Sequence, residues 1–135
     1  MNRMRTTAAI IGAVLFLAAA PAWAHHAFAA EFDSTKPITL RGTVTKVEWI
    51  NPHSWIHVDV KSPDGTVVSW MVEGGSPNAL VRRGVTKNLI PEGTEVVVDG
   101  YRAKDGTNRA NGRNITLADG RKLAVGSTNS EEQPK

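Results

Sequence analysis

The chain has 135 residues, with 16 lysines and arginines against 13 aspartates and glutamates, and it contains no cysteine. This length suits one domain with one modest hydrophobic core. Disulfides are excluded, so stability has to come from that core, and any metal site has to use histidine, carboxylates or the amino terminus.

Residues 1–24 have the pattern of a cleavable secretory signal peptide. Two arginines open the segment, the run from Ala8 to Ala20 is small or apolar, and Ala22 and Ala24 form an A-x-A cleavage site. The apolar run is shorter than the about 20 residues that a membrane-spanning helix needs, so a permanent membrane anchor is not expected. The sequence therefore predicts cleavage after Ala24.

Cleavage would also change the charge of the protein. It removes Arg3 and Arg5 from the 16 basic residues and no acidic residue, which leaves 14 basic against 13 acidic residues. Binding to phosphate backbones requires concentrated positive charge, which a nearly neutral chain lacks. Nucleic acid is therefore not expected as a partner.

The mature chain reads as a mainly β domain over residues 38–126, preceded by an N-terminal arm (residues 25–37) and followed by a disordered tail (residues 127–135). The patterns of alternation and turn residues predict strands at 38–49, 54–61, 66–73, 95–101, 113–117 and 122–125. The polar stretch 102–112 is expected to be a long hairpin loop.

The first predicted strand changes phase within its length. Its inward side follows Leu40, Gly42 and Val44, and then continues at Val47 instead of at position 46. A slip of one residue is typical of a β-bulge, which bends a strand.

A short helix is predicted between the third and fourth strands. Ser76 and Pro77 are suited to its start and Gly84 to its end, while Leu80 and Val81 are expected to face the core. Three strands, a helix and further strands are the order of an OB-fold, a small Greek-key barrel. A small β-sandwich is the alternative architecture.

The four histidines occur in two pairs and are the candidate metal ligands: His25, His26, His53 and His57. After cleavage, His25 would carry a free amino group, and together with its ring this amine suits Cu(II). His53 and His57 would lie about 13 Å apart on a straight strand, too far to share an ion unless the turn at Asn51-Pro52 folds His53 back. The alternative is that all four histidines are ordinary surface residues.

A candidate ligand surface lies on the outward side of the second and third predicted strands. In an OB-fold this is the surface that usually contacts ligands. Its members are Trp55, His57, Asp59, Met71 and Glu73, together with Ser69. The alternative is that the N-terminal arm, which carries Phe28 and Phe32, folds over this surface and buries Trp55.

Four blocks of sequence stand out: His25–Asp33, Gly42–His53 with its Glu-Trp-x-Asn-Pro-His motif, Gly75–Leu80 with its Ser-Pro-Asn motif, and Gly100–Gly106. Together they resemble a family of small exported bacterial proteins that is classed as a domain of unknown function. The resemblance implies a signal peptide, a periplasmic location and a small β-rich domain. It implies no activity and no catalytic residues.

The sequence therefore predicts a non-enzymatic periplasmic binding or accessory module, whose partner is a periplasmic protein or a small ligand. The chain has no G-x-S-x-G, phosphate-loop, EF-hand or HExxH motif. The alternative function is copper binding through the free amino terminus of His25.

Overall fold

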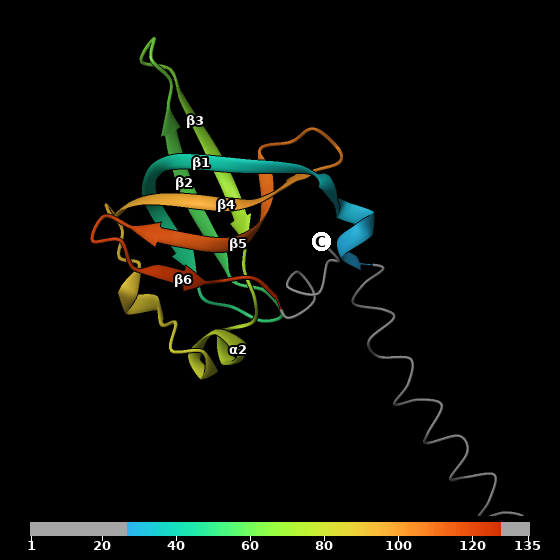
Figure 1. Cartoon of the computed structure of the whole chain (residues 1–135), viewed down its shortest axis with the longest axis vertical. Helices are drawn as coiled ribbons and strands as arrows, with labels where there is room; N and C mark the ends of the chain where they lie inside the picture. The colour runs from blue at the N-terminus through green and yellow to red at the C-terminus, as the bar shows by residue number, and fades with distance from the viewer. Residues whose placement is uncertain (1–26, 128–135) are drawn as a thin grey trace, which may run out of the picture.

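The structure, a computed structural model, describes residues 27–127, which form a mainly β domain (Figure 1). Residues 27–31 make one helical turn. The remaining elements, in chain order, are β1 (Phe32–Glu48), β2 (Trp55–Lys61), β3 (Val67–Glu73), α2 (Pro77–Arg82), the 3₁₀ helix η1 (Lys87–Leu89), β4 (Glu95–Ala103), β5 (Arg109–Leu117) and β6 (Lys122–Ala124). None of the described helices is long and apolar enough to cross a membrane.

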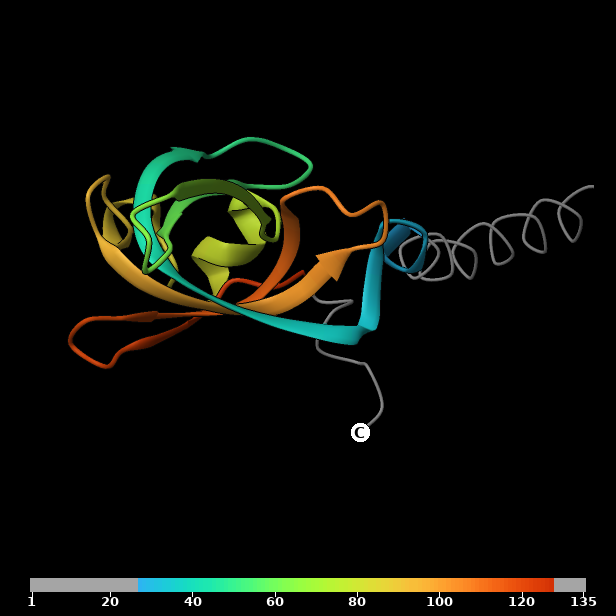
Figure 2. The same cartoon turned by 90° about the horizontal axis from the view of Figure 1, so that it is seen from above.

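The strands form a closed ring. They lie in the order β3-β2-β1-β4-β5-β6 with antiparallel neighbours, and an additional parallel pairing joins β3 to β5. This closing contact is short, since only residues 71–73 of β3 pair with residues 109–111 of β5. Figure 2 looks along the ring and shows α2 at its far end.

One hydrophobic core fills the ring. Alternate residues of β1 to β5 are buried in it, together with Leu80 of α2 and Val125, which follows β6. Ile56 and Val58, which alternate with the residues predicted to face outward on the second strand, are buried, and so is Trp70. Because α2 contributes Leu80 to the same cluster, the helix covers one end of the core.

The β-bulge in the first strand is confirmed. The register between β1 and β2 shifts between Val44 and Lys46, and Val44 and Val47 are both buried. The extra residue lets β1 pair with β4 along its first part and with β2 along its last part. A single long strand thus serves both sides of the ring.

Two of the predicted boundaries are wrong. Part of the expected arm, residues 32–37, belongs to β1, because Phe32 pairs with Ala103 and the chain stays beside β4. The expected loop at 102–112 is shorter, since β4 runs to Ala103 and β5 begins at Arg109. In both places the strand is extended by a partner that is distant in sequence. The predicted signal peptide and nearly all of the predicted tail lie outside the described residues.

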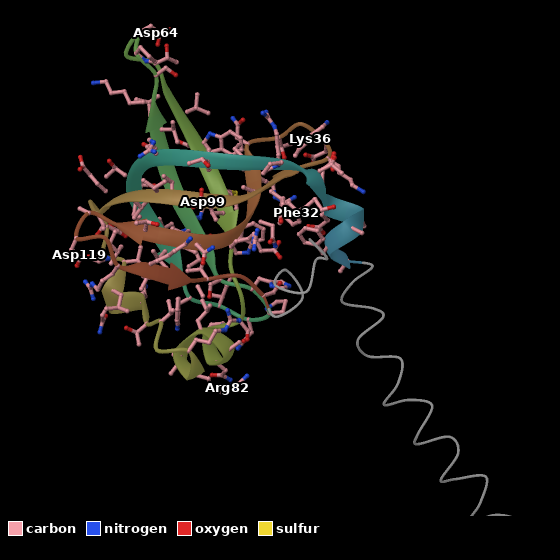
Figure 3. The ribbon with its side chains drawn as sticks, viewed as in Figure 1. Phe32, Lys36, Asp64, Arg82, Asp99 and Asp119 are labelled. Carbon is pink, nitrogen blue, oxygen red and sulfur yellow. The ribbon has the colours of Figure 1, made fainter. Side chains whose placement is uncertain are left out.

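Helix α2 begins as predicted. The Ser76 hydroxyl accepts a hydrogen bond from the Ala79 amide at 3.3 Å, and Pro77 occupies the first helical turn. Leu80 is buried, but the expectation that Val81 faces the core is wrong, because 51% of Val81 is exposed. Arg82 lies on the outer surface of the helix (Figure 3).

A second, smaller cluster holds the N-terminal segment against the ring. Phe28 and Phe32 pack with Tyr101 and Ala103 of β4. The Phe28 ring lies 5.9 Å from the ring of Phe32 and 5.9 Å from that of Tyr101, measured between centroids. Figure 3 shows Phe32 between the helical turn and the strands. The cluster fixes residues 27–32 beside the point at which the ring closes.

Candidate functional site

A cavity of about 220 Å³ lies between the N-terminal segment and the place where β3 meets β5. Its walls come from the helical turn, from the start of β2, from the end of β3 and from the start of β5. The lining residues are Ala27, Phe28, Glu31, Phe32, His53, Trp55, Glu73, Arg109, Asn111 and Ser127.

Strand register brings the polar residues of the cavity together. Trp55 of β2 is paired with Glu73 of β3, and Glu73 is paired in turn with Asn111 of β5. Residues in register on neighbouring strands point to the same side of a sheet. One row across three strands therefore supplies an aromatic ring, a carboxylate and a carboxamide.

Glu73 is the buried acid of the cavity, with only 8% of the residue exposed. Its Oε1 lies 3.5 Å from Nδ1 of His53, and the same His53 nitrogen lies 3.3 Å from the Gly74 carbonyl oxygen. Burial raises the pKa of the Glu73 carboxyl above its usual value, and the charge of Glu31 adds to the rise, whereas His53 and Arg109 oppose it. The ionised form of Glu73 is therefore less favourable here than in water.

Asn111 is more deeply buried, with 2% of the residue exposed. Its side-chain oxygen, Oδ1, is enclosed and has no hydrogen-bond partner. A buried acceptor in this condition costs about 1–3 kcal/mol relative to a satisfied one. The wall of the cavity thus contains an acceptor that a hydrogen-bond donor would satisfy.

Arg109 contacts three other residues of the cavity lining. Its guanidinium carbon lies 5.2 Å from the centroid of the Trp55 ring and 6.0 Å from that of the Phe32 ring. One of its terminal nitrogens lies 3.4 Å from a Glu31 carboxylate oxygen. The aromatic faces attract the cation and the carboxylate neutralises it, so these contacts link the N-terminal segment to β2 and β5.

The candidate metal ligands are not gathered into one site by the residues described. His53 contacts Glu73, whereas Nε2 of His57 bonds to Glu48 at 2.8 Å. Trp55 is paired with Glu48 on one side and with Glu73 on the other, which places the two histidine–carboxylate pairs on opposite sides of this residue. No group of three or more histidines and carboxylates suited to a metal occurs between residues 27 and 127. His25 and His26 lie outside the described residues.

The predicted ligand surface is divided by the structure. Trp55 and Glu73 line the cavity, but His57, Asp59 and Met71 do not. The hydrogen bond from His57 lowers the pKa of the Glu48 carboxyl below its usual value. Farther along the same face, the Ser69 hydroxyl donates to Asp59 at 2.6 Å. His57 and Asp59 therefore already have polar partners within the protein.

The N-terminal segment covers this face only in part. Its phenylalanines pack on β4 rather than on Trp55, and Arg109 lies between Phe32 and Trp55. Trp55 remains half-buried. The alternative that the arm buries Trp55 is therefore wrong, and a cavity remains between the arm and this residue.

Sequence reasoning missed Asn111, Arg109 and Glu31 as residues of the site. All three occur in polar stretches that read locally as loop or arm. Arg109 and Asn111 reach the site through the pairing of β3 with β5, which joins residues far apart in the chain. Arg109 and Asn111 could have been assigned to the site only if the pairing of β5 with β3 had been known.

A larger hollow of about 460 Å³ lies on the outside of the ring, across β1, β2, β4 and the end of β5. Arg41, Lys61, Asp59 and Glu95 contribute to its lining together with strand backbone. Charges of both signs lie at its surface, and none of its lining side chains has an enclosed, unpaired polar atom. The smaller cavity is therefore the better candidate for a binding site.

The fold and the cavity define a small domain built from a closed ring of strands, with a polar and aromatic cavity where the ring closes. The chain belongs to the family of unknown function DUF6152, whose sequence model matches residues 13–113. No curated protein and no solved structure matches the chain.

Proposed function

We propose that the protein is a non-enzymatic binding module, and that the cavity at Glu73 and Asn111 is its ligand site. The observation that carries the proposal is the enclosed Asn111 Oδ1, which has no partner within the protein. Buried polar groups are nearly always hydrogen-bonded, and a binding partner is one way to satisfy such an atom. The aromatic and carboxylate residues around it have the composition of a small-molecule site.

The architecture proposed for this module is an OB-type barrel. The order of strand pairing, the position of α2 between β3 and β4, and the bulge in β1 support this assignment. OB-folds use the face of their second and third strands to bind ligands. Trp55 and Glu73 belong to that face and line the cavity.

The proposed location is the periplasm, after cleavage of residues 1–24. The order of basic, apolar and small residues in this segment supports export. Intact-mass measurement of the protein recovered from a bacterial periplasm should give a chain that begins at His25. A mass that retains residues 1–24 would contradict both the cleavage and its proposed position.

The binding function is tested by capture of small molecules. The processed protein is incubated with a periplasmic extract, desalted and denatured, and the released molecules are identified by mass spectrometry. We expect a compound that is retained by the native protein and by Asn114→Leu, which changes an asparagine of β5 outside the cavity. Asn111→Leu should lose it. The absence of any retained compound, or equal retention by all three proteins, would contradict the proposal.

Copper binding is a second candidate function, favoured by the position of Ala27. This residue lines the cavity and comes two residues after His25, while His53 and Glu73 face the same space. His53 Nδ1 and Glu73 Oε1 lie 3.5 Å apart, so a nitrogen and an oxygen ligand are already side by side in the cavity. Cleavage after Ala24 would add the amine and the ring of His25 as further nitrogen ligands.

Titration with Cu(II), followed by electron paramagnetic resonance, tests this candidate. Nitrogen ligation should be observed in the processed protein, and it should be lost in His25→Ala and in a protein with one additional N-terminal residue. His57→Ala is the matched control, since His57 is bonded to Glu48 away from the cavity. Unchanged spectra in the first two variants would exclude the copper site.

A further inference from the structure

The cavity offers hydrogen-bond acceptors to a guest. Its polar atoms include the carboxylates of Glu73 and Glu31 and the enclosed Oδ1 of Asn111, which has no partner. Arg109 contributes donors but already contacts Glu31, Trp55 and Phe32. A guest that approaches Asn111 and Glu73 therefore has to donate hydrogen bonds.

The charges of the cavity point to a guest with a single positive charge. Arg109 pairs with Glu31, so one cation and one carboxylate already neutralise each other. Among the described residues, Glu73 makes no ion pair with a lysine or arginine, and its contact is with His53 Nδ1 at 3.5 Å. An ionised Glu73 thus lacks a full countercharge, although only 8% of the residue is exposed to solvent.

We propose that the cavity binds the primary ammonium group of a small organic amine, with N–H groups donated to Glu73 and to Asn111 Oδ1. An ammonium group has donors and no acceptor, which matches the chemistry of this part of the cavity. The proposal rests on the proposed binding function and specifies its ligand class. The adjoining rings of Phe28 and Trp55 would contact the carbon chain of the amine.

Other guests of similar size fit less well. A neutral alcohol could satisfy Asn111 but would leave Glu73 without a countercharge, and a carboxylate would meet Glu31 and Glu73 with like charge. A quaternary ammonium carries the charge but has no N–H group for Asn111. The volume of about 220 Å³ is below the about 300–1,000 Å³ typical of sites for drug-sized ligands, which limits the guest to a few carbon atoms.

The test uses n-butylammonium chloride as the probe, with the full processed protein in a buffer that contains EDTA to exclude metals. Binding is followed by ¹H–¹⁵N correlation spectra of the backbone amides. We expect saturable shifts at residues 27–32, His53, Glu73 and Asn111. n-Butanol, tetramethylammonium and butyrate are the comparison probes, and each should bind at least about tenfold more weakly, since each lacks the charge or the donors.

Two variants and one control locate the binding. Glu73→Gln and Asn111→Leu should each weaken n-butylammonium binding about tenfold, which is the effect of removing one hydrogen bond to a charged group. Glu48→Gln also removes a carboxylate from this face, but outside the cavity, and it should bind as the unmodified protein does. Because Gln and Leu retain the side-chain size, amide spectra should show that all three variants are folded.

The outcomes separate this inference from the proposed function. If n-butanol or butyrate shifts the cavity amides as much as n-butylammonium does, the ammonium assignment is overturned. The cavity would then still be a binding site. Shifts that persist in both cavity variants would also overturn the ammonium assignment. If none of the four probes causes cavity shifts, the ammonium assignment falls, and the capture experiment then decides whether the binding function falls with it.

Discussion

Gly42 allows β1 to pass close to β2 where the strand changes partners. A Cβ atom at this position would lie 2.2 Å from the carbonyl oxygen of Asp59 and 2.8 Å from Cγ1 of Val58. Backbone atoms cannot move aside as the end of a flexible side chain can. The close approach places Val44 against the core while the neighbouring Thr43 still pairs with Asp59.

Gly42→Ala should therefore lower the free energy of unfolding by about 2 kcal/mol or more, since overpacking of a rigid site costs about 1–3 kcal/mol. The measurement is the urea midpoint followed by circular dichroism. Thr45→Ala, an exposed change on the same strand, should alter stability by less than about 0.5 kcal/mol. Equal midpoints for Gly42→Ala and the unmodified protein would show that β1 and β2 do not approach this closely.

Glu73 should make stability fall as the pH rises. Its pKa in the folded protein is raised above the usual 4.5, so between these two values the folded state holds a proton that the unfolded state has released. Stability therefore decreases through this range. Glu73→Gln should be more stable than the unmodified protein at about pH 7 and similar to it at about pH 4, where both side chains are neutral.

Urea unfolding at the two pH values measures this difference. His53, Glu31 and Arg109, the groups whose charges act on Glu73, are the same in both proteins. Glu48→Gln gives the opposite control, because the pKa of Glu48 is lowered. Its ionised form stabilises the fold above the usual pKa, so this variant should lose stability near neutral pH and not in acid. A stability gain for Glu73→Gln at about pH 4 that equals the gain at about pH 7 would show that charge is not the cause.

At the scale of elements, residues 27–31 are attached to the ring by few contacts. Phe28 packs on Phe32 and Tyr101, and the Lys104 amide donates to the Glu31 carbonyl oxygen at 2.9 Å. The Lys104 ammonium also bonds to the Ala29 carbonyl oxygen. These contacts are separate from the main core, so the helical turn can detach while the ring stays folded.

Phe28→Ala should release this turn and leave the ring intact. The Lys104 amide should then exchange its hydrogen at least about tenfold faster, because its acceptor moves away, while the Val58 amide within the ring should keep its rate. Hydrogen exchange followed by NMR gives both rates. Equal acceleration at Lys104 and Val58 would instead show that the turn and the ring unfold together.

The elements with local signals could be predicted from the sequence. Alternation fixed β2 and β3, the phase slip located the bulge near Val44, and Ser76-Pro77 marked the start of α2. The extension of β5 back to Arg109 had no such signal, because it depends on β3 as a neighbour. The same is true of β1, whose start at Phe32 depends on β4.

The cavity residues could be predicted only in part, because some have a local sequence signal and others depend on a distant strand. Trp55 and Glu73 alternate with core residues and were placed correctly on the outward face. Asn111 joins them through a parallel pairing that spans the chain, and a polar asparagine next to glycine reads locally as a turn. Physical proximity in this domain is thus set by ring closure, which short-range patterns do not report.

For the whole molecule, the same contact between β3 and β5 closes the ring of strands and forms part of the cavity. The three residue pairs that close the ring include Met71 with Arg109 and Glu73 with Asn111. Three of these four residues line the cavity. The closing contact therefore carries a buried acid and an unpaired acceptor at a place where apolar residues would hold the strands together better. We therefore expect this contact to be less stable than one made by apolar residues of similar size.

Asn111→Leu should accordingly stabilise the empty protein by about 1 kcal/mol, because it replaces an unsatisfied buried acceptor by an apolar group of the same heavy-atom count. Urea unfolding in the presence of EDTA measures the change. Asn114→Leu lies on the same strand outside the cavity and should give no comparable gain. A loss of stability in Asn111→Leu would mean that the carboxamide is satisfied in the free protein, and the main support for a ligand at this position would disappear. A gain would show that the asparagine at the closing pair is retained at the expense of stability, as expected for a residue that serves binding.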